Sequence, residues 1–126
     1  MSQQGECAVR AVDPQRVAAT REVLIDVDEA TRLAEVFKLL GDPNRTRILF
    51  ALAEAGELCV CDLAATVDMN EAAVSQAMRL LRTAGVVRNR RDGRMSWYRL
   101  DDAHVRVLLD LSREHLAHTQ PIAPVP

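Results

Sequence analysis

The sequence contains few aromatic residues, which make up only 3% of its 126 residues. Its core must therefore be built mainly from Leu, Val, Ile and Ala, which suits packed helices. There is no apolar run of about 18 residues, so we expect no membrane span. The N-terminus has no apolar signal segment, so we expect a cytoplasmic protein. A Gly-rich phosphate loop, a Gly-x-Ser-x-Gly elbow and a His-Glu-x-x-His motif are also absent from the sequence, which argues against an enzyme.

Cysteine is scarce, with three residues in the whole chain. An odd number of cysteines in a protein of the reducing cytoplasm argues against a disulfide framework and leaves thiols available to a metal ion. The chain length predicts one domain (16–119), preceded by a mobile N-terminal arm (1–15) and followed by a flexible tail (120–126). Such a domain has a modest core, so we expect association of two copies to stabilise it further.

Apolar residues recur at helical spacing along most of the chain. The pattern predicts helices over 16–23, 28–40, 43–55, 61–67, 70–84 and 102–119. Asp28, Asp42 and Asn70 are expected to cap three of these helices, because their side chains accept hydrogen bonds from free backbone N–H groups. The residues expected on buried faces are Ile48, Leu49, Leu52 and Ala55 in the 43–55 helix, and Val74, Met78, Leu81 and Ala84 in the 70–84 helix.

Two short β-type runs, 86–89 and 95–100, flank an Asp-Gly pair that is a strong hairpin signal. A helix, a short helix, a turn, another helix and then a basic hairpin is the order of elements in a winged helix-turn-helix. The sequence therefore predicts a mainly α fold with a small β-hairpin. In such a fold the 70–84 helix enters the major groove of DNA, and the hairpin reaches neighbouring phosphates.

The charge distribution supports double-stranded DNA as the partner, although the net charge is −2. The window 79–99 holds seven arginines and one acid and carries +6, whereas the rest of the chain carries −8. Such segregation is typical of a surface that binds a polyanion. The residues expected to contact DNA are Ser75, Gln76 and Arg79 at base edges, and Arg90, Arg91 and Arg94 in the hairpin.

All three histidines lie within 15 positions near the C-terminus. On a helix, His104 and His115 differ by about 20° around the axis but by roughly 16 Å along it. His115 and His118 are helical neighbours. One helix thus offers two half-sites that are too far apart to hold one ion. In a dimer, two antiparallel helices would bring Asp102 and His104 of one chain against His115 and His118 of the other, a ligand set suited to tetrahedral zinc.

Three motifs stand out together: Asp-Pro-Asn-Arg at 42–45, Glu-Leu-Cys-Val-Cys-Asp-Leu-Ala at 57–64, and the terminal Asp-x-His…His-x-x-His. With them the chain resembles the ArsR/SmtB family of metal-sensing repressors over 27–119, and most closely its cadmium/lead- and zinc-responsive branches. The resemblance implies a winged-helix homodimer, paired through its terminal helices, that binds operator DNA when metal-free and dissociates when metal binds. By that resemblance, the histidine cluster matches an inter-subunit zinc site, and Cys59 and Cys61 match a thiolate site.

The thiolate site is incomplete with two cysteines. Cys59 and Cys61 are two residues apart, a spacing unsuited to a regular helix but workable in a turn that leads into one. Cys7 on the arm is the natural third ligand, and in the cadmium/lead sensors the arm comes from the partner chain. Three sulfurs favour Pb²⁺ or Cd²⁺, with Asp62 as either a fourth ligand or a helix cap. Ala64 replaces the third cysteine of the arsenic-sensing branch, which argues against arsenite.

The expected effectors are therefore Zn²⁺ or Cd²⁺/Pb²⁺, and the sequence leaves open which of the two sites regulates. Two alternatives remain at this point. A thiol-based redox-sensing repressor of the same fold would oxidise its cysteines instead of binding metal, but it would leave the histidine cluster without a role. A metal-buffering protein that binds no DNA is the other alternative, and the basic hairpin argues against it.

Overall fold

The computed structural model of the protein describes residues 11–119. The chain divides into two compact units, with the boundary between Ala34 and Glu35. The second unit contains all the predicted site residues except Cys7, which lies outside the described residues. The predicted arm and tail also fall largely outside them, so the limits proposed for the domain stay predictions. Among residues 11–119, no helix is both long and apolar enough to cross a lipid bilayer.

Helices α1 (Pro14–Val23) and α2 (Val27–Leu40) both begin at aspartate caps. The side chain of Asp13 accepts a hydrogen bond from Arg16 N at 3.0 Å, so α1 begins two residues before its expected start. In α2 the capping residue is Asp26, whose Oδ1 accepts from Glu29 N at 2.8 Å. The prediction of Asp28 as this cap was wrong. Asp28 lies in the first helical turn, where its negative charge suits the helix dipole.

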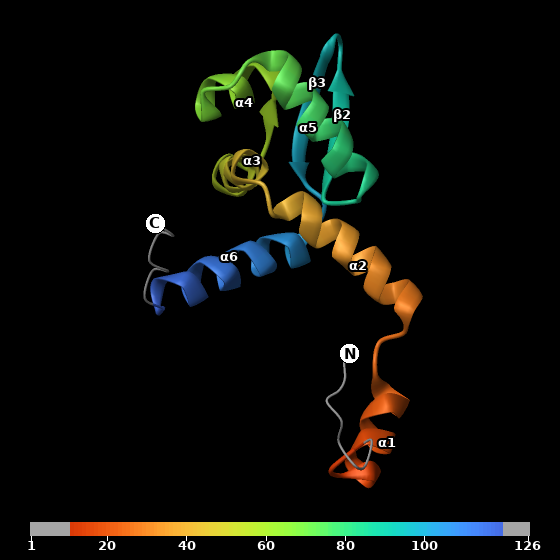
Figure 1. Ribbon diagram of the computed structural model, residues 1–126. Helices are drawn as coiled ribbons and strands as arrows, with labels where there is room; N and C mark the ends of the chain where they lie inside the picture. Colours follow the sequence, from red (N-terminus) through yellow and green to blue (C-terminus); the bar gives the residue numbers. More distant parts are fainter. Residues whose placement is uncertain (1–10, 120–126) are drawn as a thin grey trace, which may run out of the picture. The chain divides into compact units, whose positions relative to one another are not determined.

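The second unit is a winged helix-turn-helix (Figure 1). Its elements follow in the order α3 (Pro43–Ala55), β1 (Leu58–Cys59), α4 (Val60–Val67), α5 (Glu71–Thr83), β2 (Val87–Asp92), β3 (Met95–Leu100) and α6 (Ala103–Ala117). The strands form one antiparallel sheet in the order β1-β3-β2. This confirms the predicted fold class. Strand β1 was not predicted, because two residues are too few to produce an alternating pattern.

Helix α3 is fixed to the end of α2 by polar contacts around the intervening turn. Asp42 caps α3 as expected, with its Oδ2 3.0 Å from Arg45 N. Arg45 Nε donates to the carbonyl of Leu39 at 2.7 Å, and Thr46 Oγ1 donates to that of Leu40 at 2.9 Å. These bonds satisfy carbonyls that the last turn of α2 leaves without an intrahelical partner. At its other end, α3 stops at Gly56, whose φ of +87° is readily adopted only by glycine.

The core lies between α3, α4, α5 and the sheet. Its fully buried side chains are Ile48, Leu49, Leu52, Leu63, Val74, Met78, Leu81 and Val87. They are almost all aliphatic, as the low aromatic content requires. Ala84 is partly buried and packs against this cluster. Ala55 was expected to be buried but is exposed, because it is the last residue of α3 and extends past the core.

The neighbouring residues Leu80 and Leu81 test this packing. Leu81→Ala is expected to lower the free energy of unfolding by about 2–5 kcal/mol, because its side chain is fully buried and its loss leaves a cavity. Leu80 is 42% exposed, so Leu80→Ala should cost less than about 1 kcal/mol. Urea denaturation at one fixed protein concentration measures both. Equal losses for the two variants would contradict the assigned orientation of α5.

Candidate metal and DNA-binding sites

Helices α4 and α5 form the helix-turn-helix. Asp68 adopts a left-handed conformation (φ 59°) in the turn between them, and aspartate tolerates this conformation better than most residues. The Asn70 side chain then caps α5, with its Oδ1 2.8 Å from Ala73 N. Arg47 Nη1 donates to the carbonyl of Val67 at 3.0 Å and so ties the end of α4 to α3. The two helices are therefore held at both sides of the turn.

The inner face of α5 is buried, and its outer face carries the polar residues expected to contact DNA. Val74, Ala77, Met78 and Leu81 form the inner face. Gln76 and Arg79 are exposed, and Ser75 is half-buried. These three side chains lie on the helix that a winged helix-turn-helix inserts into the major groove. The structure thus places Gln76 and Arg79 on the exposed face, as the sequence predicted, and exposes Ser75 only in part. The contacts of all three with DNA stay a prediction.

The hairpin formed by β2 and β3 is the wing. Gly93 lies in its two-residue turn with a φ of +62°, a conformation that glycine adopts without strain. Arg91 and Arg94 are exposed at the tip. Neither has an ion-pair partner among residues 11–119. Two free guanidinium groups at the end of a basic hairpin are available to phosphates.

Arg90, the third predicted hairpin contact, is already engaged within the chain. Its Nε and Nη2 donate to the two carboxylate oxygens of Glu57 at 2.9 and 2.8 Å. Its guanidinium also lies over the ring of Trp97, with Cζ 5.7 Å from the ring centroid. The hydrogen bond from Arg90 lowers the pKa of Glu57, so this carboxyl is charged at neutral pH. Sequence reasoning missed Glu57 and Trp97, since their contact with Arg90 depends on the unpredicted strand β1.

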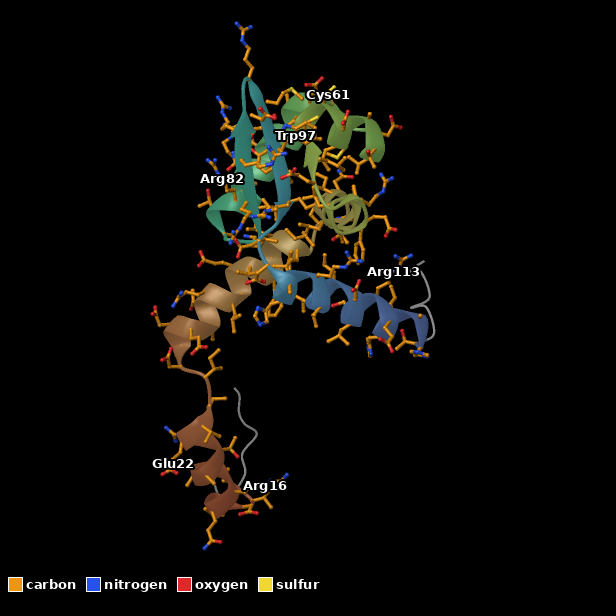
Figure 2. The ribbon with its side chains drawn as sticks, turned by 180° about the vertical axis from the view of Figure 1, so that it is seen from behind. Arg16, Glu22, Cys61, Arg82, Trp97 and Arg113 are labelled. Atoms are coloured by element: carbon orange, nitrogen blue, oxygen red, sulfur yellow. The ribbon has the colours of Figure 1, made fainter. Side chains whose placement is uncertain are left out.

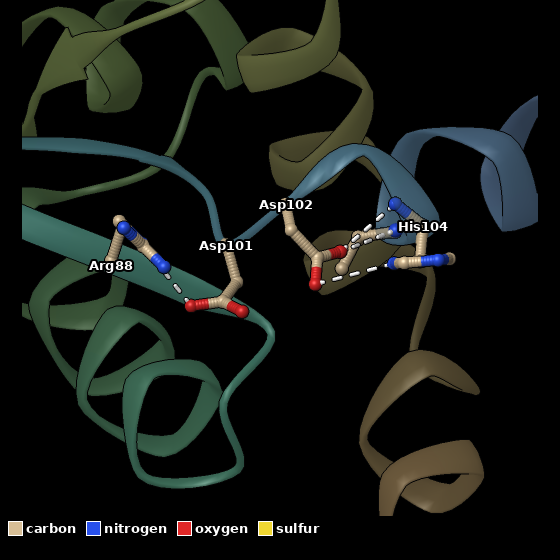
Figure 3. A network of polar contacts seen from close by, with 5 residues as sticks. Arg88, Asp101, Asp102 and His104 are labelled. Atoms are coloured by element: carbon tan, nitrogen blue, oxygen red, sulfur yellow. Dashed lines mark hydrogen bonds and ion pairs between the residues drawn. The ribbon is translucent and has the colours of Figure 1, made fainter.

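The Asp102 side chain caps α6, which ends near His118. Asp102 Oδ1 accepts hydrogen bonds from His104 N at 2.9 Å and Val105 N at 3.3 Å (Figure 3). The Nδ1 atom of His104 lies 3.5 Å from Asp102 Oδ2. Partial desolvation raises the pKa of Asp102, but the hydrogen bonds from Val105 and His104 outweigh it, so the net pKa lies below the ordinary value. Asp102 is therefore a negatively charged helix cap beside an imidazole.

The four residues of the predicted histidine site occupy opposite ends of α6. Asp102 and His104 lie at its first turn, and His115 and His118 at its last. All three histidines are exposed. Within the part of the chain that the structure describes, no three His, Cys, Asp or Glu side chains converge as a metal site. The structure thus separates the two residue pairs along α6, as the helical spacing predicted, while their role as metal half-sites and their union across a dimer stay predictions.

Cys59 and Cys61 flank the start of α4 but differ in environment. Cys59 is buried, is the N-cap residue of α4 and lies opposite Trp97 in the pairing of β1 with β3. Cys61 is exposed on the first turn of the helix, and Figure 2 shows it at the surface. The side chain of Asp62 does not cap α4, contrary to one reading of the sequence, because the helix begins earlier, at Val60.

The thiol of Cys61 lies in a negatively charged environment. The charge of Glu71 is the largest cause that raises its pKa, followed by desolvation and by Cys59 and Asp62. A thiol must lose its proton to bind a metal ion. In the metal-free protein Cys61 is therefore mainly protonated at neutral pH, and a bound cation would replace that proton. The same carboxylates that disfavour the thiolate would attract the cation.

Taken together, the helix-turn-helix, the basic wing and the outward polar face of α5 define the class of this protein: it is a winged helix-turn-helix DNA-binding protein. A family model described as "Bacterial regulatory protein, arsR family" matches residues 42–89, from the cap of α3 into the wing. The transcriptional repressor SmtB homolog of Synechocystis sp. is 41% identical over 114 residues, which cover 90% of this chain and 83% of that protein.

The chain therefore belongs to the ArsR/SmtB family of transcriptional regulators, and it is not an enzyme. A cadmium resistance regulatory protein CadC homolog of Staphylococcus aureus is 40% identical over 83 residues, which cover 66% of this chain and 69% of that protein. The solution structure of apo-NmtR matches with a TM-score of 0.69 and 36% identity, covering 82% of this chain and 88% of NmtR.

A homodimeric winged helix-turn-helix domain from Mycobacterium bovis, a possible ArsR-family regulator, matches with a TM-score of 0.66 and 31% identity. The match covers 80% of this chain and 98% of that domain. The fold predicted from the sequence is thus found in relatives, at least one of which pairs as a homodimer.

Substitutions of Asp102 separate its capping role from a role as a metal ligand. Asp102→Ala should lower the thermal midpoint of the metal-free protein at pH 7, since two backbone N–H groups lose their acceptor. Asp102→Asn should have a thermal midpoint close to that of the wild type, because asparagine caps helices equally well, but it should bind zinc more weakly. The depressed pKa means that the carboxylate stabilises the fold above the unfolded-state pKa of about 3.9 and loses this effect at lower pH. The difference in thermal midpoint between the wild type and Asp102→Ala should therefore become smaller as the pH is lowered. A difference that grows would contradict the role of Asp102 as a charged helix cap.

Proposed function

We propose that this protein is a metal-responsive repressor that binds operator DNA as a metal-free homodimer and releases it on binding Zn²⁺, Cd²⁺ or Pb²⁺. Release would derepress genes for metal resistance or efflux. The similar proteins from Synechocystis sp. and Staphylococcus aureus are named a transcriptional repressor and a cadmium resistance regulator. As a DNA-binding regulator, the protein would act in the cytoplasm.

The observation that carries this proposal is the pattern along α6. Val107, Leu108 and Leu111 are 53%, 40% and 59% exposed in the single chain. Leu111 lies seven residues from both His104 and His118, so all three fall within about 40° around the helix. An apolar strip with a histidine at each end favours burial against a second copy of itself.

Antiparallel pairing centred on Leu111 would complete the ion site. Since Leu111 is the midpoint between His104 and His118, a twofold axis at this residue sets His104 of one protomer opposite His118 of its partner. The carboxylate of the N-cap residue Asp102 lies 3.5 Å from the imidazole of His104, and His115 lies about one turn before His118. Two identical sites of one carboxylate and three imidazoles result, one at each end of the helix pair. This donor set is suited to tetrahedral Zn²⁺.

Such an ion would control DNA binding through the geometry of the dimer. The two α5 helices must match successive major-groove faces of the operator. An ion that bridges the α6 pair fixes the relative orientation of the protomers. If that orientation does not fit DNA, binding of the metal lowers the affinity for the operator. The coupling is reciprocal, and values of about 5–150-fold are usual.

The thiolate site would serve the softer ions. Cys59 and Cys61, with Cys7 as the third ligand, supply sulfur donors that prefer Cd²⁺ or Pb²⁺. Because Cys59 is buried and Cys61 exposed, ligation of one ion by both requires a local change at the start of α4. The raised pKa of Cys61 counts against the redox alternative, since oxidation of a thiol depends on its thiolate form.

DNA would be bound by α5 and the tip of the wing. Ser75, Gln76 and Arg79 are proposed to face base edges, and Arg91 and Arg94 to contact phosphates.

Metal titrations of operator-bound protein test the regulatory proposal. Zn²⁺ should release the wild-type protein from a labelled operator, as followed by fluorescence anisotropy. His104→Ala should bind the operator but resist release by Zn²⁺, because each inter-subunit site loses one ligand. Cys61→Ser should keep the zinc response and lose most of the response to Cd²⁺ and Pb²⁺.

Mg²⁺ serves as the control ion, since it prefers oxygen ligands and should release nothing. A wild-type protein that stays on the operator in Zn²⁺, Cd²⁺ and Pb²⁺ would refute the proposed function. Release by zinc that survives in His104→Ala and is lost in Cys61→Ser would assign regulation to the thiolate site alone. Release by peroxide without any response to metal would favour the redox alternative.

The wing prediction concerns salt dependence. Arg91→Ala should weaken binding to operator DNA and to non-operator DNA about equally, because both present the same phosphates. The slope of log affinity against log salt should become shallower by about 0.9 for each phosphate that the variant no longer neutralises. The matched control is Arg113→Ala, on α6, where the guanidinium lies over Phe50. This control should keep the wild-type slope. An unchanged slope for Arg91→Ala would show that Arg91 does not bind phosphate.

A further inference from the structure

We propose that Arg90 is a positioning residue that links the thiolate site to the wing through Glu57 and Trp97, and not a phosphate contact. The proposal rests on the thiolate site described under the proposed function. It concerns how an ion bound at the start of α4 reaches the DNA-binding hairpin, which is joined to that segment through the sheet.

The sheet places three residues in one row from the thiolate site to the wing. Cys59 on β1 lies opposite Trp97 on β3, and Trp97 lies opposite Arg90 on β2. Residues that face each other on neighbouring antiparallel strands project from the same face of the sheet and lie about 5 Å apart. A shift of Cys59 therefore changes its packing beside Trp97. The Trp97 ring in turn lies under the Arg90 guanidinium.

A second connection runs through Glu57, two residues before Cys59 in the chain. Both oxygens of its carboxylate accept hydrogen bonds from Arg90, at 2.9 and 2.8 Å. A bidentate pair constrains direction as well as distance. Glu57 and Trp97 thus contact the same guanidinium. Glu57 is linked to Cys59 along the chain, and Trp97 is linked to it by strand pairing. Figure 2 shows Trp97 and Cys61 in the same region of the second unit.

Ion binding at the thiolates must disturb this arrangement. Cys59 is buried, and within the described residues it belongs to no group of three side chains that could hold an ion. Because Cys61 is exposed, Cys59 has to become more exposed to share a metal ion with it. Only Leu58 and Cys59 pair with β3, so little backbone pairing opposes the shift. We infer that the shift loosens the contacts of Arg90 with Glu57 and Trp97, that the wing loses its set position, and that operator affinity falls.

The chain offers a charge-matched control for Glu57→Gln. Arg88 lies two residues before Arg90 on β2, and its Nε donates to Asp101 Oδ1 at 3.3 Å (Figure 3). Asp101→Asn therefore also removes one ion pair between β2 and another segment. It leaves the row from Cys59 to Arg90 intact.

The first experiment compares operator affinity with and without Cd²⁺ for the wild type, Glu57→Gln and Asp101→Asn. Glu57→Gln should weaken the metal-free complex by about two- to fivefold, as loss of a partly exposed ion pair does. Its cadmium-bound affinity should equal that of the wild type, because the ion pair is already broken there. The ratio of the two affinities should thus fall about two- to fivefold in Glu57→Gln and stay at the wild-type value in Asp101→Asn.

A purely structural role of Glu57 would lower both affinities together and leave their ratio unchanged, which would overturn the proposal. The salt slope gives a second criterion. Arg90→Ala should weaken operator binding yet keep the wild-type slope, unlike Arg91→Ala. A slope shallower by about 0.9 for each lost contact would identify Arg90 as a phosphate contact and also overturn the proposal.

Trp97 is the only tryptophan in the chain, so its emission reports directly on the row. Cd²⁺ should change this emission in step with the thiolate-to-cadmium absorption band, and Cys61→Ser should abolish both signals. An absorption band without a change in emission would overturn the proposal. Cadmium could also change the emission but leave the operator affinity of the wild type unaltered. That result would support the link from the thiolate site to Trp97 and refute the proposed release of the operator by an ion at this site.

Discussion

The DNA-binding surface depends on the burial of one face of α5. Val74, Met78 and Leu81 are fully buried in the core shared with α3 and α4. Complete burial of such a side chain stabilises the fold by about 1.5–3 kcal/mol. A rotation of α5 that exposed these three residues would remove a large part of the stability of a domain of this size. The core therefore forces the opposite face, with Gln76 and Arg79, toward solvent.

The wing is held in a different way from α5. Partly exposed polar contacts tie it to three other segments: Arg82 Nη1 donates to Asn89 Oδ1 at 3.2 Å, Arg88 pairs with Asp101, and Arg90 pairs with Glu57. Exposed polar contacts are individually weak, since water competes for the same groups. Helix α5 is thus packed along its whole inner face, whereas the wing is packed only through core residues such as Val87 and Tyr98, and its outer part is held by polar contacts that are easily exchanged. This combination suits a regulator whose DNA affinity must change without unfolding the core.

Helix α6 leaves an apolar surface exposed in the single chain. Only Leu109 of this helix is buried, while its apolar strip faces solvent. Charge is also unevenly distributed along the chain, although the net charge is low. The acidic residues lie mainly outside the basic window of α5 and the wing. The basic window and the apolar strip of α6 lie on different residues, so DNA binding and the proposed pairing of two chains would not compete for the same surface.

Elements whose signals are local could be predicted from the amino-acid pattern. The Asp42 and Asn70 caps, the hairpin turn at Gly93 and the helical period of α5 each depend on residues within a few positions of one another. The separation of His104 from His115 along α6 was predictable for the same reason, since it follows from helical spacing. The error at the cap of α2 was also local, because two aspartates two residues apart compete for one role.

Contacts between residues distant in the sequence depend on how the folded chain packs. Strand β1 has two residues and exists because β3 offers it hydrogen-bonding partners, so no local pattern announces it. The contact between Arg90 and Glu57 spans 33 positions and depends on that strand. A basic residue in a hairpin has the same local sequence whether it is free or paired. The packing of the sheet, and not the pattern of charges, therefore separates Arg90 from Arg91 and Arg94.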